Sequence, residues 1–135
     1  MTDQELPWLS LADVGEQIAT GVRDPVDVTG EMLARVETKD PAIGAFTLIT
    51  EDRAFVAARQ AQAELTNGQH RGPLHGVPIA VKSLCAVAGE PNAAGTEVLD
   101  GPLARQNSTV VRRLEAAGAV LLGTLTMTEG ASAVH

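Results

Sequence analysis

Apolar residues recur at helical spacing near the start of the chain. Leu11, Val14 and Ile18 lie three or four residues apart and follow Ser10, a residue type that caps helix amino termini. The pattern predicts a first amphipathic helix that begins after Ser10 and ends at Gly21.

A second amphipathic helix is predicted after Asp24-Pro25, a capping residue followed by a proline at the first helical position. Its apolar positions share one face up to Glu37, and Gly30 weakens it. Asp40-Pro41 is typical of a turn, so we expect this helix to stop before it.

The next segments predict a short strand and an alanine-rich helix. Residues 45–49 are apolar and β-prone, and Thr50 is the expected cap of a helix over 51–66 that Asn67-Gly68 ends. Small side chains allow another backbone to approach this helix closely. The residues of this smooth face are Ala54, Ala57, Ala58, Ala61 and Ala63, with Val56 and Leu65.

The second half of the chain predicts two strands of a parallel sheet. Residues 77–83 and 119–123 are apolar runs, and a long loop over 84–106 and a helix lie between them. Asn107 or Ser108 caps this helix, Gly118 closes it, and we expect Val110, Val111, Leu114 and Ala117 to face inward. A strand, a crossover with a helix and a second strand indicate an α/β fold, and strands that are apolar on both faces need covering layers on each side.

Composition narrows the possible partners. The chain is 44% hydrophobic but has only two Phe, one Trp and no Tyr, which indicates an aliphatic core. A net charge of −7 without a basic run disfavours nucleic acid, and no apolar stretch approaches the length of a membrane span. A single cysteine and an acidic, non-secretory amino terminus favour the cytoplasm.

Cysteine and histidine residues do not suggest a metal site or a catalytic pair. Cys85 has no recognisable partner histidine and is interpreted as a small buried hydrophobe. His70 and His75 lie in a glycine-rich loop without carboxylate or cysteine companions, and His135 is terminal. We expect no metal, and we expect His75 to shape the turn before the strand.

Lys82 lies at the end of the apolar run 77–83 and permits two interpretations. Its stem can pack while its ammonium group reaches water or a carboxylate, which is a purely structural role. Alternatively, a desolvated and neutral Lys82 accepts a proton from a hydroxyl group and activates it for acyl transfer. The neighbouring sequence decides between the two.

Five blocks of sequence, in this order and spacing, resemble the amidase signature family. The likeness covers nearly the whole chain, and its most specific part is Gly-Val-Pro-Ile-Ala-Val-Lys, residues 76–82. The blocks are residues 72–82, Ala94-Gly95-Thr96, Asn107-Ser-Thr-Val-Val, Leu114 to Gly123 and Met127-Thr-Glu129.

The resemblance implies a fold and a chemistry. The fold is the amino-terminal part of an α/β/α sandwich with a central mixed sheet, with helices over 1–70 and the start of the sheet over 71–135. The chemistry is carboxamide hydrolysis by a Ser–cis-Ser–Lys triad, with Lys82 as general base, a small-molecule amide substrate and no cofactor. Both serines of the family lie beyond His135. The resemblance also suggests that Gly95, Thr96 and Met127 line the substrate site.

Three positions depart from the family pattern, and a rival interpretation stays open. Ser83 stands where an aspartate is usual, Thr126 where asparagine is common, and Gly130 where a bulky residue is usual, whereas Glu129 matches with a structural role. Ser83 is not expected to act as the nucleophile, since neighbouring strand residues point to opposite faces. The rival is an inactive, truncated piece that binds a complementing chain or a second copy through exposed strand edges.

Overall fold

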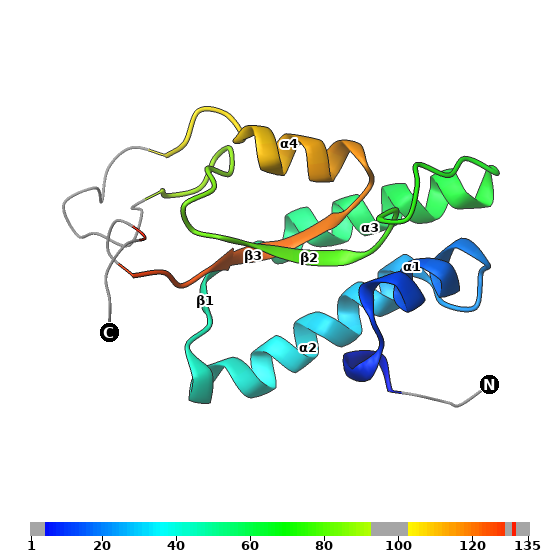
Figure 1. The fold of residues 1–135 in the computed structure, drawn as a ribbon, viewed down its shortest axis with the longest axis horizontal. Helices are drawn as coiled ribbons and strands as arrows, with labels where there is room; N and C mark the ends of the chain where they lie inside the picture. The colour runs from blue at the N-terminus through cyan, green and yellow to red at the C-terminus, as the bar shows by residue number, and fades with distance from the viewer. Residues whose placement is uncertain (1–4, 93–102, 129–130, 132–135) are drawn as a thin grey trace.

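The computed structural model describes residues 5–92, 103–128 and 131. Within these residues a single-turn helix at Leu6–Trp8 precedes four α-helices and three strands (Figure 1). The helices are α1 (Leu11–Ala19), α2 (Pro25–Ile43), α3 (Glu51–Thr66) and α4 (Thr109–Ala116), and the strands are β1 (Phe46–Ile49), β2 (Pro78–Lys82) and β3 (Val120–Leu125).

The three strands form one mixed sheet in the order β1-β3-β2. β2 runs parallel to β3, which confirms the predicted parallel pair, and β1 is antiparallel to β3. The central strand β3 is buried from Val120 to Thr124 because it has a neighbour on each side. β2 is less buried than its apolar sequence predicts, since it is the edge strand of the described sheet.

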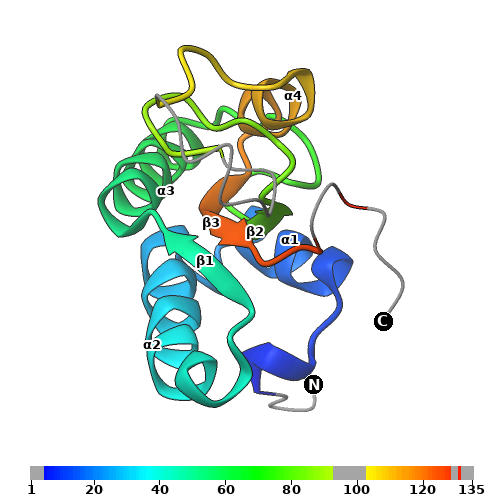
Figure 2. The same ribbon diagram turned by 90° about the vertical axis from the view of Figure 1, so that its left-hand side faces the viewer.

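Helices cover both faces of the sheet. On one face, α2 and α3 pack against Val120 and Leu122 of β3, and Ala54 and Ala58 of α3 are completely buried there. On the other face lies α4 (Figure 2), and its Val111 packs against Val81 of β2 and Leu121 of β3. The small alanine side chains let α3 approach the sheet closely, as their pattern predicted.

Two helix starts follow the capping rules. The Ser10 hydroxyl accepts a hydrogen bond from the Asp13 N–H (3.1 Å), and the Asp13 carboxylate accepts one from the Ser10 N–H (3.1 Å), which makes a capping box. Asp24 accepts from the Val26 N–H (2.7 Å) at the start of α2. These contacts satisfy N–H groups that have no partner within the helix.

The predicted turn at Asp40-Pro41 is wrong, because α2 continues through Pro41 to Ile43. A proline removes one helical N–H donor, but here only two further residues of the helix follow it. Gly44 then adopts a left-handed conformation (φ 65°), and the Asp40 carboxylate accepts hydrogen bonds from the Ala45 and Phe46 N–H groups. Asp40 therefore stabilises the helix end instead of starting a turn.

Two further side-chain predictions are wrong. Thr50 precedes α3, as predicted, but its side chain does not cap the helix; its hydroxyl donates to the Leu121 carbonyl (3.2 Å) across the sheet. Val110 was expected to face inward but is 52% exposed, whereas Val111 is buried. Ser108 is the observed cap of α4 and accepts from the Val111 N–H.

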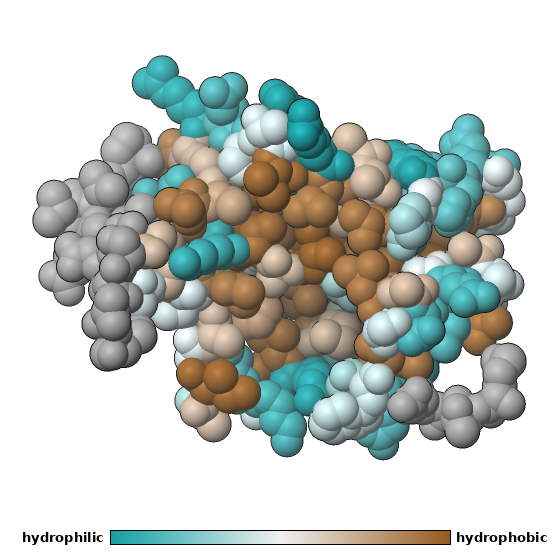
Figure 3. All heavy atoms as spheres, in the orientation of Figure 1, coloured by the Kyte–Doolittle hydropathy of each residue, from teal (hydrophilic) through white to brown (hydrophobic). Residues whose placement is uncertain are grey.

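The outer side of β2 is the most apolar part of the face seen in Figure 1. Brown side chains gather there between α4 and α1 (Figure 3). In the described residues β2 has a hydrogen-bonded neighbour on one side only, β3. In this part of the chain no helix is long and apolar enough to cross a membrane.

Candidate functional site

Lys82 is the last residue of β2 and lies at the carboxyl end of the parallel strand pair. It stands beside Leu125, the last residue of β3, and the chain turns immediately afterwards through a hydrogen bond from the Cys85 N–H to the Lys82 carbonyl (2.8 Å). Val81 is buried and Lys82 is exposed. Ligand sites of parallel α/β sheets are typically found at this edge.

Of the three residues expected to line a substrate site, one lies within the described part. Met127 follows β3 by two residues and is half-buried. Because β2 and β3 are parallel, Met127 and Lys82 both lie at the carboxyl end of this strand pair. Thr126 beside it is held by hydrogen bonds to Ala45 and Gly44. Gly95 and Thr96 lie outside the described residues, as do Glu129 and Gly130.

Ser83 begins the turn after β2 and is not part of the strand. Its N–H still donates to the Leu125 carbonyl (2.9 Å), which extends the ladder by one bond. Its hydroxyl oxygen is buried and has no hydrogen-bond partner among the described residues. A buried hydroxyl without a partner is uncommon, and this one is next to Lys82 in the sequence.

Cys85 packs against apolar side chains as expected but is only partly buried, and the interpretation of His75 is wrong in one respect. Cys85 is partly buried against the cluster of Val81 and Val111. His75 does lie in the turn before β2, but it has a carboxylate companion, since its Nε2 is 3.0 Å from Glu64 Oε2. Across the part of the chain that the structure describes, no group of three metal-ligating side chains comes together.

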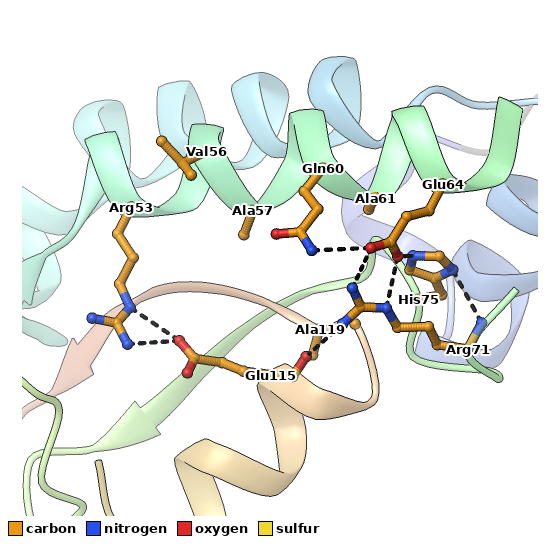
Figure 4. A pocket seen from close by; sticks show the side chains of 11 residues that line it. Arg53, Val56, Ala57, Gln60, Ala61, Glu64, Arg71, His75, Glu115 and Ala119 are labelled. Atoms are coloured by element: carbon orange, nitrogen blue, oxygen red, sulfur yellow. Dashed lines mark hydrogen bonds and ion pairs between the residues drawn. The ribbon is translucent and has the colours of Figure 1, made fainter. Parts of the chain in front are cut away.

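A cavity of about 310 Å³ lies between α3 and the start of β3 (Figure 4). Two charged pairs mark its ends, Arg53 with Glu115 and Arg71 with Glu64. The cavity reaches Ala119, which precedes β3 at the amino ends of the parallel strands, and Lys82 is not among its lining residues. Its other lining residues are Val56, Ala57, Gln60, Ala61, His75 and Gly118.

Glu64, Arg71 and His75 form a polar cluster at one end of this cavity (Figure 4). The Arg71 guanidinium, followed by the Gln60 amide, holds the pKa of Glu64 at about 2, below its usual 4.5. Burial lowers the pKa of His75 despite the nearby Glu64 carboxylate. His75 Nδ1 accepts from the Arg71 N–H (3.2 Å), so the neutral ring carries its proton on Nε2, 3.0 Å from Glu64 Oε2.

This cluster predicts an acid-dependent loss of stability. Because the pKa of Glu64 is lower in the folded protein, its contribution is present above pH 4.5 and lost as the pH falls toward 2. We expect the difference in unfolding free energy between the wild type and Glu64→Gln to shrink over that range in urea titrations. Glu37→Gln, at an exposed position of α2, is the control. A constant difference would contradict the role of Glu64.

The sequence did not reveal the charged residues around the cavity. Glu64 and Arg71 are 7 residues apart in the sequence, and Arg53 and Glu115 are 62 residues apart, so no local pattern links the members of either pair. One signal in the sequence was that Arg71 and His75 follow shortly after Glu64, which lies in the last turn of α3. A pairing over that distance depends on how α3, α4 and the loop pack together.

Comparisons with known proteins agree on one family. A sequence model described as Amidase matches residues 27–135. AmiD of Mycobacterium bovis (strain ATCC BAA-935 / AF2122/97) is 42% identical over 131 residues, which is 97% of this chain and 28% of AmiD. A glutamyl-tRNA(Gln) amidotransferase subunit of Anaeromyxobacter sp. (strain K) is 41% identical over 93% of this chain and 26% of that protein.

A solved structure shows the same fold. Native peptide amidase from Stenotrophomonas maltophilia superposes with a TM-score of 0.85 and 30% sequence identity, covering 93% of this chain and 26% of that chain. The chain thus spans about a quarter of the length of the relatives it matches.

Proposed function

The chain belongs to the amidase signature family, and from this premise we propose that the protein containing it hydrolyses the C–N bond of a carboxamide, with Lys82 as the general base. The relatives above include a peptide amidase and an amidotransferase component, whose names both refer to amide chemistry. The proposal is limited to this class of bond, because the chain covers about a quarter of those proteins.

The position of Lys82 is the observation that carries this proposal. It ends the block Gly-Val-Pro-Ile-Ala-Val-Lys at the carboxyl edge of the parallel strands, where its side chain is exposed. Among the described residues, no carboxylate lies within ion-pair distance of its ammonium group. The lack of a carboxylate partner among these residues leaves the ammonium group open to a ligand, and the specific motif that ends at Lys82 supports the functional role.

The proposed reaction follows the triad logic of the family. Lys82 accepts the proton of a serine hydroxyl through a second serine, and the serine oxygen attacks the carbonyl carbon of the amide. The proton then passes to the nitrogen as the C–N bond breaks, and ammonia or an amine leaves. Water attacks the acyl-enzyme in turn and releases a carboxylic acid. Both serines would come from residues that follow position 135, in the sheet of a complete α/β/α sandwich.

The first experiment is to measure the intact mass of the protein as its own cell produces it, together with ammonia release from simple carboxamides. The 135 residues account for 14.0 kDa. We expect a mass several times larger and ammonia release that requires the longer chain. A longer chain that releases neither ammonia nor an amine from any carboxamide tested would overturn the proposal.

A second candidate function rests on the open side of β2. The strand has one hydrogen-bonded neighbour in the described residues, and apolar side chains gather over it (Figure 3). Such an edge can pair with a strand of another chain. A native mass near 14.0 kDa together with co-purification of a second chain would favour this role over catalysis.

A further inference from the structure

We propose that Arg53 is a positioning residue that, together with Asn107 and Glu115, holds the loop leaving Lys82 in place. The role in hydrolysis rests on the proposed function, but the structural clamp does not. Arg53 lies in the first turn of α3, Asn107 precedes the cap of α4, and Glu115 lies in the last turn of α4. Three distant parts of the sequence therefore meet at one point.

The three side chains form a closed ring of hydrogen bonds. The Arg53 Nε and Nη2 both donate to Glu115 Oε1, at 3.0 and 2.7 Å. Asn107 Nδ2 donates to the other carboxylate oxygen, Oε2 (2.7 Å), and Arg53 Nη2 also donates to Asn107 Oδ1 (3.3 Å). Each member binds the other two, which fixes the plane of the guanidinium group.

The ring binds the main chain of one loop residue, Ala88. The Ala88 N–H donates to Asn107 Oδ1 (2.7 Å), and the Ala88 carbonyl accepts from Arg53 Nη1 (3.3 Å). Both polar groups of this peptide residue are thus satisfied by side chains from elsewhere in the fold. A loop that needed only to cross the surface would have these groups in water.

Ala88 lies where the segment leaving Lys82 is hydrogen-bonded to the segment that leads into α4. The Ser108 N–H donates to the Ala86 carbonyl (2.8 Å), and the Gly89 N–H donates to the Ala104 carbonyl (2.9 Å). Val87 between them is buried in the cluster of Val81 and Val111. The hydrogen-bonded ring therefore holds Ala88 next to the point where the chain leaving Lys82 is paired with the segment that leads into α4.

An arginine is required for this arrangement. Its planar fork donates in three directions at once, whereas a lysine ammonium can satisfy Glu115 but cannot also reach Asn107 and Ala88 in the same geometry. The Arg53 and Glu115 side chains are about one third exposed, at 30% and 31%, so a simple pair would stabilise the fold only slightly. The value of the contact lies in the network and in the backbone that it holds.

The first test is hydrogen exchange at the Ala88 and Ser108 amides in the protein purified at its native length. We expect Arg53→Ala to speed exchange at Ala88 by about tenfold or more, and Arg53→Lys to restore little of the protection. Arg59→Lys on the same helix is the matched control. The Arg59 guanidinium lies over the aromatic ring of Phe55 at 5.9 Å and takes no part in the network of Arg53, Asn107 and Glu115. Full rescue by Arg53→Lys, or unchanged exchange in Arg53→Ala, would overturn the clamp.

The second test separates the clamp from the proposed function. Lys39 and Lys82 are the two lysines of the chain, so the labelling rate of Lys82 by an amine reagent can be referred to that of Lys39. We expect Arg53→Ala to change this ratio and, in an active chain, to lower kcat more than it raises KM. Faster exchange at Ala88 with an unchanged Lys82 ratio and unchanged kcat would overturn the positioning role. An inactive wild type with faster exchange would overturn the proposed function and leave the clamp supported.

Discussion

Replacing Lys82 by alanine is expected to lower kcat/KM for carboxamide hydrolysis by about 10²–10⁴-fold, the range that a positioned general base contributes. The loss should fall mainly on kcat, because the proton is transferred during the chemical step and not on binding. Steady-state ammonia release by the active, full-length chain measures this effect. Since Lys82 is an exposed strand end, the variant should remain folded, which circular dichroism checks.

Lys39→Ala is the matched control for this experiment. Lys39 is also exposed, lies near the end of α2, and is the other lysine of the chain. Its loss should leave kcat/KM within about twofold, as expected for a surface change away from the site. Activity in Lys82→Ala equal to that of Lys39→Ala would remove Lys82 from the mechanism.

Among Gly→Ala substitutions at the described glycines, Gly123→Ala is expected to cause the largest loss of stability, because its added Cβ would make the closest contact with backbone. A Cβ at position 123 would clash with the Leu48 carbonyl oxygen and would lie 3.1 Å from the Ile49 Cα, both in the backbone of β1. Neither atom can move without separating β1 from β3, which pair at this point. We expect a loss of about 3 kcal/mol or more in urea unfolding, at the upper end of overpacking effects.

Gly30→Ala is the opposite case and serves as the control for that experiment. Gly30 lies within α2, and a Cβ there would meet only the Phe55 ring at 3.9 Å, an ordinary van der Waals contact. Alanine in a helix is favoured over glycine by about 1 kcal/mol, so this variant should be more stable than the wild type. Equal effects of the two substitutions would show that the close approach of β1 to Gly123 does not limit stability.

Most of the helices and strands could be predicted because their signals are local. The start of α1 at Ser10, the carboxyl end of α3 before Asn67-Gly68 and the strand at Val120 all follow from capping residues, a turn signal and apolar runs in the adjacent sequence. One error occurred where a distant contact decided the outcome, since Thr50 bonds to β3 and not to its own helix. The other error was local, because α2 continues through Pro41 and Asp40 accepts hydrogen bonds from the residues just after the helix.

The candidate site could be predicted in part. Lys82 stood out because a charged residue ends an apolar strand within a specific motif, and the structure places it at the sheet edge together with Met127. The environment of Ser83 could not be read from the sequence, since the burial of its hydroxyl depends on packing around the turn. The charged cluster around His75 was missed for the same reason.

The sequence by itself determined the family, the order of the helices and strands, and the lysine at the end of β2, because these follow from short patterns of residue type. Only the tertiary structure decided that β1 joins the sheet beside β3 and that Arg53, Asn107 and Glu115 meet at Ala88. It also decided that the cavity reaches the amino end of β3, whereas Lys82 lies at the carboxyl end of β2. The physical reason is that hydrogen bonds and ion pairs between distant segments depend on which helix faces which strand, and that choice is made by packing of the whole fold.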